Sequence, residues 1–497
     1  MQEVGIQVVY GAIEEAFKAE DLDKVEQLLW PALDQFPGES RLWFYGGCIF
    51  FKRGKSALAA QLFTRAIDLD DSPHIYSNLG ACYRRMNLHE QGLQVMRAAL
   101  DRNPTYAPSL VNIGSMYVNE GSPEKGIPYL EKAMQIGGER GAIWNCGLLY
   151  LESARFGEGF DLYRQGITHE RASRSYGTAE KAPPEVERIP EPALLTPEAV
   201  EEARASGRKP RVIVWGEQGI GDELMFGTII EDMRQDFEVV FECHPRLEKL
   251  HRNAHPGLTI YPTRKDEWIN WPISDRVIAE FKAPIGDLGG YYRRDLASFK
   301  SSWTGGTYRP KPEEVSGYQS RLELAAGSRP IVGLATRGGV MQTSRTYRTI
   351  RHLEIDRLMT ETNALFVSLD YDDMLELASY IEDKYGDERF RWFPSITQHW
   401  DYHHTAALIG ACDLVVTVCQ SVFHISAGMG QATRVLTPRR CAWRYAPIPG
   451  EPELSYWYPG EQIKLYRQDD ENSWQHPLDK VIADINGMTI SNQEAAA

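Results

Sequence analysis

A spacing of 33 or 34 residues recurs along the first third of the chain. Small or apolar residues fall at intervals of 34, 33, 34 and 33 residues, at Ile13, Gly47, Gly80, Gly114 and Gly147. Aromatic residues follow three positions after most of these anchors, at Phe50, Tyr83, Tyr117 and Tyr150. A unit of this length is a pair of antiparallel helices that cannot bury its apolar face alone, so neighbouring units must stack. The period therefore predicts a superhelix of helix pairs over residues 1–170.

The repeating unit resembles the tetratricopeptide motif, most clearly in "YSNLGACYRRMNLHEQGLQVMRAALDRNP". Small residues let the two helices of a unit approach closely, and the aromatic residue fills the groove between them. A generic helical bundle is the alternative interpretation, although anchors at one shared period are difficult to obtain by chance. We therefore interpret these glycines and aromatic residues as packing residues without a chemical role.

Composition narrows the class of protein. A chain of 497 residues has room for about three domains, and its content of hydrophobic residues, 42%, is ordinary for a globular protein. The net charge of -15 argues against a broad surface for binding nucleic acid, although it is compatible with a local basic groove. The sequence has no apolar run of about 18 residues, no basic signal region at its start and no C-x-x-C pair. We expect a cytoplasmic protein with reduced thiols and no membrane span.

A boundary follows the repeats. Residues 171–210 are rich in Pro and Glu, which predicts a linker with one short helix that begins at Pro197 and is capped by Thr196. Beyond it, short runs such as "RVIVW" and "CDLVVTV" alternate with helical stretches, as in parallel sheets with crossover helices. The alternation weakens over residues 262–328 and then begins again. It predicts an α/β region of two doubly wound, Rossmann-like lobes, at residues 211–325 and 326–490.

Ligands of such sheets bind beyond the carboxyl ends of the strands, and clusters of polar residues stand there. The first cluster is "VIVWGEQGIGDELMF", in which Gly216, Gly219 and Gly221 allow a tight turn and bring backbone N–H groups close to a ligand. It matches neither common phosphate-binding fingerprint, because Leu224 replaces the third glycine of G-x-G-x-x-G and no G-K-[ST] is present. Asp222 is interpreted either as a helix cap or as a catalytic carboxylate.

The second and third clusters lie in the second lobe. The stretch "ATRGGVMQTSRTYRT" follows a strand and concentrates arginines, whose forked donors match phosphate, at Arg337, Arg345, Arg348 and Arg351. The stretch "VVTVCQSVFHISAGMG" starts a helix near Ser421, whose free N–H groups attract anions, and His424 stands one turn further on. A solvated basic loop and a packed polar histidine are the alternatives for these two clusters.

Signals for a metal site are weak. One histidine-rich stretch follows no standard ligand spacing, at His399, Asp401, His403 and His404. His404 and Thr405 open a helix and are interpreted as a cap or a ligand contact. The stretch "LDYDDM" contains an Asp-x-Asp, but it follows a strand and is interpreted as a helix cap. We therefore assign no metal ligand.

Several stretches, taken in order, resemble one family. The repeats are followed by "WGEQGIGDELMF", "VSL", "HHTAALIGACDLVVTVCQSVFHISAGMGQATRVL" and "YWYPGEQIKLYRQ". This order is similar to that of bacterial and phage repeat-bearing glycosyltransferases, whose C-terminal half resembles the heptosyltransferases of glycosyltransferase family nine. The layout is also similar to that of the O-linked N-acetylglucosaminyl transferases. The resemblance covers nearly the whole chain, is weakest over residues 262–330, and implies the two-lobed GT-B type of fold.

The resemblance also implies roles for individual residues. In the pair Gly221–Asp222, Asp222 corresponds to the catalytic base that removes the proton of the acceptor hydroxyl. The donor phosphates are held in the family by a Thr-Arg pair and a following basic residue, which correspond here to Thr336, Arg337 and Arg345. Arg348 is an alternative to Arg345 as the basic residue that follows the Thr-Arg pair. The implied reaction is a direct displacement that inverts the sugar and uses neither a metal nor another cofactor.

The third cluster departs from the family motif Asp-Thr-Gly/Ser-x-x-His. Ser421 and His424 are kept, whereas Cys419 and Gln420 replace the Asp and the Thr. Donation by backbone N–H groups survives this change, but the side-chain contacts do not, so the identity of the donor stays open. The predicted nucleotide-sugar-binding set is Gly219, Gly221, Thr336, Arg337, Arg345, Arg348, His404, Thr405, Gln420, Ser421, Val422 and His424.

The function predicted from these features is an inverting, metal-independent glycosyltransferase of a hexosyl- or heptosyltransferase-like kind that uses a nucleotide-diphosphate sugar. Its repeats would hold the acceptor, which we expect to be a protein or peptide, because repeat superhelices grip extended chains. One alternative is a degenerate transferase fold that scaffolds protein partners without turnover, which the change at Cys419 and Gln420 favours. Another is a different doubly wound enzyme. The negative net charge disfavours a nucleic-acid partner.

Overall fold

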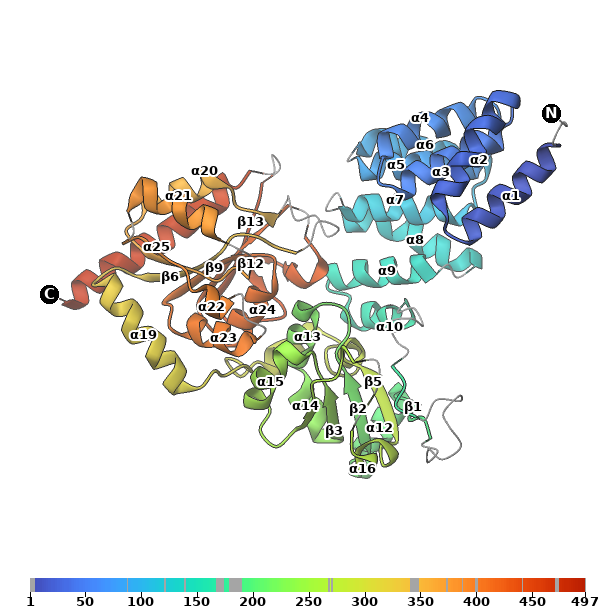
Figure 1. Ribbon diagram of the computed structural model, residues 1–497. Coiled ribbons are helices and arrows are strands. Elements are labelled where there is room, and N and C mark those ends of the chain that lie inside the picture. Colours follow the sequence, from blue (N-terminus) through green and yellow to red (C-terminus); the bar gives the residue numbers. More distant parts are fainter. Residues whose placement is uncertain are drawn as a thin grey trace. The chain divides into compact units, whose positions relative to one another are not determined.

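The computed structural model describes residues 5–86, 88–119, 122–137, 140–166, 174–177, 190–266, 269, 271–339, 348–371, 374–386, 388–397, 401–439, 441–469 and 473–496. The chain divides into two compact units, Met1–Leu149 and Tyr150–Ala497. The first holds most of the helical repeats, and the second holds two α/β domains with mostly parallel sheets (Figure 1). The predicted fold class is confirmed. Among the described residues, no helix has the length and apolar character needed to cross a membrane.

The repeat region consists of antiparallel helix pairs with short turns. Each pair buries its apolar side chains against the next, as at Leu29, Leu62 and Met96, so small cores follow one another along the array. The helices are α1 (Ile6–Lys18), α2 (Leu22–Gln35), α3 (Ser40–Lys52), α4 (Ser56–Ile67), α5 (Pro73–Arg85), α6 (His89–Arg102), α7 (Ala107–Asn119), α8 (Pro123–Gly137), α9 (Arg140–Glu152) and α10 (Phe156–Gly166).

Anchor glycines of the repeat mark the points of closest contact between the helices of a pair. A Cβ atom at each would lie 2.5 Å from a side chain of the second helix, in the pairs Gly47–Phe63, Gly80–Met96 and Gly114–Leu130. Real Cβ atoms do not approach other heavy atoms so closely, and in a densely packed core the contacting side chains cannot easily move away. The interpretation of these glycines as packing residues is confirmed.

The first α/β domain contains a five-stranded parallel sheet in the order β1-β5-β2-β3-β4. In its centre, Trp215 at the end of β2 lies between Pro284 of β5 and Glu242 of β3. The glycine turn that follows β2 therefore leaves from the middle of the sheet edge. The strands are β1 (Ala193–Leu194), β2 (Arg211–Trp215), β3 (Glu238–Glu242), β4 (Thr259–Tyr261) and β5 (Phe281–Pro284).

The second α/β domain contains an eight-stranded sheet in the order β11-β12-β13-β10-β9-β6-β7-β8. The strands from β13 to β8 are parallel, and β12 and β11 add an antiparallel edge. The strands are β6 (Ile331–Ala335), β7 (Leu365–Ser368), β8 (Phe390–Arg391), β9 (Leu414–Val418), β10 (Thr433–Thr437), β11 (Pro447–Ile448), β12 (Glu451–Ser455) and β13 (Ile463–Arg467).

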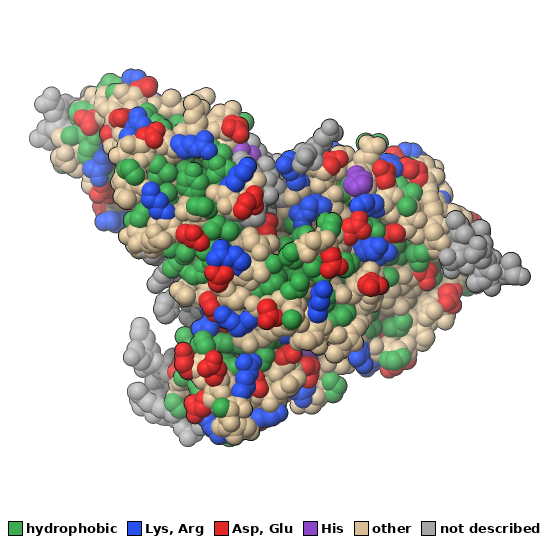
Figure 2. Space-filling model, turned by 180° about the vertical axis from the view of Figure 1, so that it is seen from behind, with side chains coloured by type: hydrophobic (Ala, Val, Ile, Leu, Met, Phe, Trp, Pro, Cys, Tyr) green, Lys and Arg blue, Asp and Glu red, His purple; other side chains and the backbone are tan. Residues whose placement is uncertain are grey.

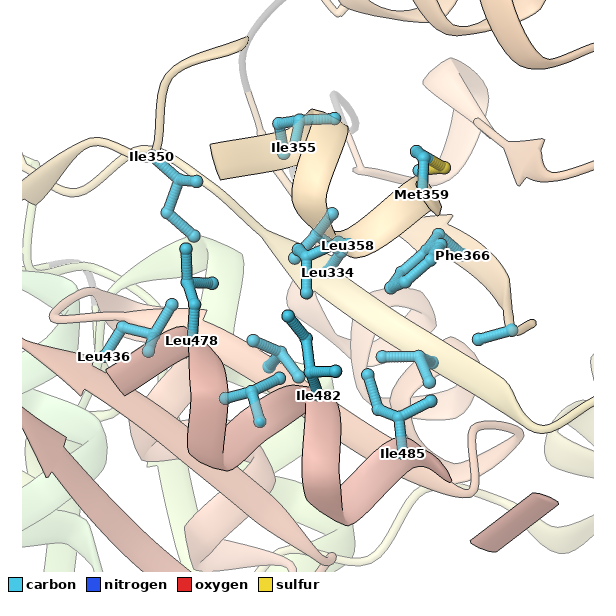
Figure 3. Packing of buried hydrophobic residues seen from close by; sticks show 14 of the residues in the cluster. Leu334, Ile350, Ile355, Leu358, Met359, Phe366, Leu436, Leu478, Ile482 and Ile485 are labelled. Carbon is cyan, nitrogen blue, oxygen red and sulfur yellow. The ribbon is translucent and has the colours of Figure 1, made fainter. Parts of the chain in front are cut away.

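Helices cover the sheets of the second unit. On one face of the second sheet, Leu358 of α20 and Ile482 of α25 pack with Leu334 and Phe366 of the strands (Figure 3). The helices of this unit are α12 (Pro197–Ser206), α13 (Ile220–Gly227), α14 (Ile230–Asp236), η1 (Pro245–Leu247), α15 (Glu248–Ala254), α16 (Ile273–Val277), η2 (Ile285–Asp287), α17 (Leu288–Tyr292), α18 (Leu296–Ser302), α19 (Pro312–Ala326), α20 (His352–Glu361), α21 (Leu375–Tyr385), α22 (Pro394–Thr397), α23 (Tyr402–Gly410), α24 (Ser421–Gly428), η5 (Trp443–Tyr445) and α25 (Gln475–Ala496).

The described parts of the predicted linker pack on the first sheet. Helix α12 begins at Pro197 as predicted, and the hydroxyl of Thr196 accepts the N–H of Ala199 at 3.3 Å. Strand β1 extends the sheet beside β5. Tyr176 is buried, and its ring lies 6.2 Å from that of Trp215. These parts therefore belong to the core of the first α/β domain, because their aromatic and apolar side chains are needed to cover the sheet.

The last repeat helix, α10, packs within the second unit. The Phe160 ring lies 6.0 Å from the Trp443 ring, which belongs to the second α/β domain. On its other side, a Cβ atom at Gly289 of the first α/β domain would lie 2.3 Å from the Phe160 ring. Helix α10 therefore packs against both α/β domains, and for this reason the compact unit begins at Tyr150, ahead of the predicted limit at residue 170. The other predicted domain limits stay predictions.

Candidate functional site

The second sheet brings three loops together at one edge. Strands β9, β6 and β7 are parallel neighbours, and they end at Val418, Ala335 and Ser368. Because parallel strands end at the same edge, the loops that follow them lie side by side. The Thr336–Arg337 turn and the start of α24, which belong to two of the predicted clusters, are thereby adjacent.

Asp370 joins these loops. Its carboxylate accepts the N–H and the hydroxyl of Thr336 at 2.8 Å, the N–H of Arg337 at 3.2 Å and Nε2 of Gln420 at 3.4 Å. The side chain is 1% exposed, and burial raises its pKa although these hydrogen bonds oppose the shift. The interpretation of this Asp-x-Asp stretch as a helix cap is wrong for Asp370. Helix α21 has Met374 at its N-cap, and Asp370 fixes the turn after β6 instead.

Buried polar atoms without partners surround the N-terminus of α24. The side chains of Gln420 and His424 are 5% and 1% exposed, yet Oε1 of the first and Nε2 of the second have no hydrogen-bond partner among the described residues. Nδ1 of His424 lies 3.1 Å from the Tyr458 hydroxyl. Burial, and then the charge of Arg444, lower the pKa of His424 well below its usual value, so the ring is neutral at pH 7. Unpaired buried polar atoms beside free helix N–H groups are typical of a ligand site.

The arginines of the second cluster take different places. Nη1 of Arg348 donates to the carbonyl of Cys419 at 3.1 Å, so this guanidinium reaches the strand end that precedes α24. Arg337 pairs with Thr349 through its backbone. Arg345 lies outside the described residues. The structure thus places positive charge from Arg348 beside the helix N-terminus, where a phosphate group would also be favoured.

The glycine turn of the first α/β domain faces α24. Gly219 is the N-cap of α13, and its N–H donates to the Asp222 carboxylate at 3.1 Å. A Cβ atom at Gly221 would lie 3.1 Å from Cδ2 of His424, so the turn packs directly on α24. Asp222 also forms an ion pair with Arg444, and 13% of its side chain is exposed. Asp222 is therefore both a helix cap and a bridge between the two α/β domains, which are closed onto each other here.

Two further carboxyl groups of low exposure, those of Glu217 and Asp287, lie at or beside the glycine turn. Burial, together with the carboxylates of Asp287 and Asp222, raises the pKa of Glu217 to about 8. Burial also raises the pKa of Asp287 to about 7. The hydroxyl of Tyr163 in α10 accepts a hydrogen bond from Gln218, whose φ of 56° is uncommon for a residue other than glycine. Contacts from α10 thus hold this turn in an unusual backbone conformation.

Gly216 makes room for a protein side chain. A Cβ atom at Gly216 would lie 1.9 Å from Oε2 of Glu223, which is fully buried. The Glu223 carboxylate accepts Nη1 of Arg264 and the N–H of His244, both at 2.7 Å. Burial acts to raise the pKa of Glu223, but His251 and Arg264 hold it below its usual value. The role of Gly216 is therefore to admit an internal ion pair rather than to expose N–H groups to a ligand.

Three other predicted residues, His404, Thr405 and Val422, have side chains that contact other parts of the fold. The hydroxyl of Tyr318, in α19, lies 3.4 Å from Nδ1 of His404, so this histidine contacts a covering helix. Thr405 and Val422 are 4% and 1% exposed and pack in the interior. Sequence patterns do not distinguish these buried helix positions from neighbours that face the loops.

Helix α23 meets α24 through a tyrosine rather than a histidine. The hydroxyls of Tyr402 and Ser421 lie 3.4 Å apart, whereas His403 pairs with Glu314 at 2.5 Å. His399 lies outside the described residues. Within the part of the chain that the structure describes, no three His, Cys, Asp or Glu side chains are grouped so that they could hold a metal ion.

Sequence reasoning missed Asp370, Glu217, Arg444 and Tyr402 as members of this region. A signal existed for the first two, because Asp370 follows a strand that ends at the shared edge and Glu217 stands inside the glycine turn. Arg444 and Tyr402 carry no such signal. Arg444 reaches Asp222 across the contact between the two α/β domains, and Tyr402 reaches Ser421 from a neighbouring helix of the same domain.

We expect Asp370→Asn to loosen the turn after β6. The amide would present its N–H₂ group to the donors of either Thr336 or Arg337, so unfolding free energy should fall by about 1–3 kcal/mol, measured by urea denaturation. The matched control is Asp413→Asn, because Asp413 accepts the N–H of Ile331 at 2.8 Å at the opposite end of β6. Equal stability of Asp370→Asn and the wild type would contradict this role.

The repeat region matches a known family model. The tetratricopeptide-repeat model matches residues 73–106 and 107–136. A tetratricopeptide-repeat protein of Thermus thermophilus is similar at 20% identity, covering 32% of this chain and 89% of its own, with a TM-score of 0.30. PilF of Pseudomonas aeruginosa is similar at 16% identity, covering 33% of this chain and 78% of its own, with a TM-score of 0.30.

Most of the chain is homologous to one curated protein. Protein FlbA of Caulobacter vibrioides is 22% identical over 503 residues, which cover 90% of this chain and 78% of FlbA. A shorter match, 31% identical over 70 residues, is to "Essential for maintenance of the cell wall protein 1" of Saccharomyces cerevisiae, and it covers 14% of this chain and 8% of that protein. The chain is thus a tetratricopeptide-repeat protein with a C-terminal α/β region, homologous to FlbA.

Proposed function

We propose that this protein is an inverting, metal-independent glycosyltransferase that uses a nucleotide-diphosphate sugar and binds a protein acceptor through its repeats. The observation that carries the proposal is the set of unpartnered buried atoms at the start of α24, Nε2 of His424 and Oε1 of Gln420. They stand beside helix N–H groups and the Arg348 guanidinium, which together suit a diphosphate. Buried polar atoms of this kind suit the polar groups of a nucleotide.

The proposed reaction requires the two α/β domains to separate. Gly221 packs on His424 and Asp222 is paired with Arg444, so a donor has to open this contact in order to enter. Opening would free the Asp222 carboxylate to take the proton of an acceptor hydroxyl. It would also free the Arg444 guanidinium to stabilise the charge that develops on the leaving diphosphate. The same ion pair would thereby contain both the base for the acceptor hydroxyl, Asp222, and the cation for the leaving diphosphate, Arg444.

The repeats offer a line of polar groups to an acceptor. Carboxamides recur on the first helices of successive pairs, where Nδ2 of Asn112 donates to the Ser77 hydroxyl at 3.3 Å and Nδ2 of Asn145 donates to the Ser115 hydroxyl at 3.1 Å. Asn78 occupies the equivalent position one repeat earlier. Amide and hydroxyl groups in a row can pair with the backbone of an extended polypeptide. Tetratricopeptide repeats bind proteins in general, which supports a protein acceptor.

The first test is binding of nucleotides. We expect one of UDP, GDP and ADP to raise the unfolding temperature, with stabilisation of about 2.7 kcal/mol at a concentration of 100 times Kd. We expect Arg337→Ala to weaken that binding about tenfold in calorimetry, because a charged hydrogen bond to phosphate is lost. The control is Arg351→Ala, because Arg351 lies on the same loop, has a side chain that is 74% exposed and pairs with Glu354. Equal affinity of Arg337→Ala and the wild type would remove Arg337 from the site.

A second candidate function is a scaffold that binds partners and transfers no sugar. The closed contact at Gly221 and the Asp222–Arg444 ion pair favour it, because both groups already have partners in this structure. The same nucleotide panel separates the two functions. Stabilisation by a nucleotide supports the transferase, and the absence of any shift supports the scaffold.

A further inference from the structure

A cavity of about 560 Å³ lies between α10, α12 and α17, apart from the loops at the edge of the second sheet. This volume is within the range of pockets that bind small molecules. Its lining brings three arginines together, Arg164, Arg204 and Arg294, and it also carries the acids Asp161 and Glu201. On the face drawn in Figure 2, by contrast, acidic and basic side chains of the described residues are interspersed.

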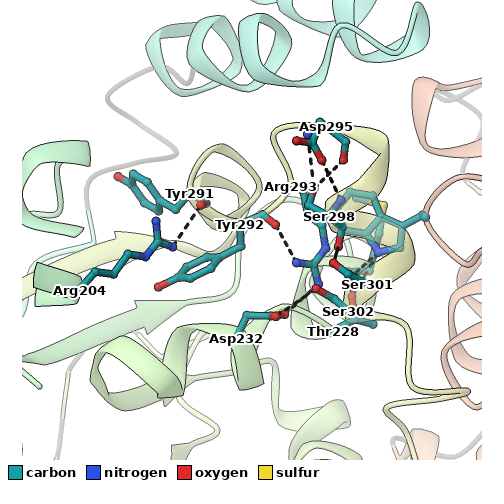
Figure 4. A network of polar contacts seen from close by, with 12 residues as sticks. Arg204, Thr228, Asp232, Tyr291, Tyr292, Arg293, Asp295, Ser298, Ser301 and Ser302 are labelled. Atoms are coloured by element: carbon teal, nitrogen blue, oxygen red, sulfur yellow. Dashed lines mark hydrogen bonds and ion pairs between the residues drawn. The ribbon is translucent and has the colours of Figure 1, made fainter. Parts of the chain in front are cut away.

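The three guanidinium groups converge on one short segment. Nη2 of Arg204 donates to the carbonyl of Tyr291 at 3.4 Å, as Figure 4 shows, and Nη1 of Arg294 donates to the carbonyl of Gly290 at 3.1 Å. The guanidinium of Arg164 lies over the Tyr291 ring, 5.1 Å from its centroid. The arginines come from three different segments, yet the end of α17 fixes all of them. Donors held in advance in this way lose little freedom when a ligand binds.

The three arginines differ in how well their charge is balanced. Arg294 pairs with Asp161 through two bonds, at 2.8 and 2.9 Å, and Arg204 pairs with Asp236 at 2.8 Å. Among the described residues, Asp287 forms an ion pair with Arg164 at 3.8 Å, which is beyond hydrogen-bond distance, and Glu198 lies close enough for the charge of Arg164 to help lower its pKa. Burial raises the pKa of Asp287 to about 7, so this partner is partly protonated near neutral pH. The Arg164 guanidinium is 22% exposed and keeps donors for a ligand.

We propose that this cavity binds the phosphate or diphosphate group of a small molecule, with Arg164 as its principal donor and Arg204 and Arg294 at its sides. Forked guanidinium donors match the several acceptor oxygens of phosphate better than those of a single carboxylate. The site is distinct from the nucleotide site of the proposed function, which lies at the N-terminus of α24. It stands whether or not the protein transfers a sugar.

The test is calorimetric titration of the full-length protein with inorganic pyrophosphate at physiological ionic strength. We expect Arg164→Gln to weaken binding at this cavity at least about tenfold. Arg294→Gln should weaken this binding as well. Because the Arg294 side chain is 50% exposed, its loss costs little stability, so this variant tests the site even if Arg164→Gln fails to fold. The charge-matched control is Arg208→Gln, because Arg208 is 59% exposed, lies just beyond α12 and pairs with Glu280.

The outcomes separate the two sites. Pyrophosphate binding that Arg164→Gln and Arg294→Gln weaken, but that Arg208→Gln leaves unchanged, assigns the cavity. Binding that only Arg337→Ala weakens would overturn the cavity site while supporting the nucleotide site. No measurable binding by the wild type, or equal binding of succinate, would overturn the phosphate assignment.

Discussion

Asp222→Asn is expected to lose sugar transfer by about 100-fold or more while it keeps its affinity for the nucleotide. An amide has no basic oxygen that can take the proton of an acceptor hydroxyl, and general-base catalysis contributes about 10²–10⁴-fold to rates. Gly219 can still donate to the amide oxygen, so α13 should keep its cap. The measurement is mass spectrometry of acceptor proteins after co-expression, in which transfer is detected as the added mass of a sugar.

The ion pair with Arg444 complicates that variant and also supplies its control. Asp222→Asn leaves Arg444, which is 20% exposed, without its partner, so a loss of about 3 kcal/mol in unfolding free energy is expected as well. Arg444→Gln breaks the same pair and is the control for stability alone, because Arg444 is itself proposed to act on the leaving diphosphate. The double variant should recover stability without recovering transfer. Normal turnover by Asp222→Asn would refute the assignment of Asp222 as the base.

Glu223→Gln is expected to lower the unfolding free energy by about 3–5 kcal/mol, the largest effect on stability that we predict. Glu223 is fully buried, and the variant would leave the Arg264 guanidinium, 11% exposed, without a counter-charge. It would also turn an amide N–H₂ group toward one of the two donors, Arg264 Nη1 and the His244 N–H, that the carboxylate accepts. Urea denaturation at neutral pH measures the effect.

The pH dependence of the Glu223 effect has a defined sign. The pKa of Glu223 is lowered in the folded protein, so its stabilisation is present above the unfolded value of about 4.3 and is lost as pH falls through the folded value. The difference between the wild type and Glu223→Gln should therefore shrink in acid. The control is Glu280→Gln, whose pair with Arg208 is exposed and is expected to contribute at most about 1 kcal/mol. A change below that size for Glu223→Gln would show that the buried pair is not stabilising.

Periodic elements of the fold could be predicted from the sequence. The repeat period indicated the helix pairs, and runs such as those of β2, β6 and β9 indicated buried parallel strands, because their patterns reflect burial on known faces. Strand β5 (Phe281–Pro284) could not be found, since it is short and contains Lys282 and a proline. The helical run "DELMFGTIIEDMRQ" is divided into α13 and α14 around Thr228, whose hydroxyl donates to the Met225 carbonyl at 2.7 Å.

The candidate site was predictable only in part, because sequence indicates strand ends but not the partners that meet them. The turn at Thr336 and the start of α24 follow strands, and they do lie at one edge. The pairing of Asp222 with Arg444 depends on contact between two domains, which no local pattern encodes. The charge of a buried group is also difficult to predict from sequence. A glutamate is expected to be ionised at neutral pH, but burial and nearby carboxylates raise the pKa of Glu217 to about 8.

The packing of α10 against both α/β domains limits how such a gene can be rearranged. Repeats can be gained, lost or exchanged upstream of Tyr150 without disturbing the lobes, because each repeat relies mainly on its neighbours. A recombination joint placed after α10 would instead remove Phe160 from its place between Trp443 and Gly289. We therefore expect chimeras that exchange the array to inherit α10 together with the α/β domains, so that arrays of different length would all end at this helix.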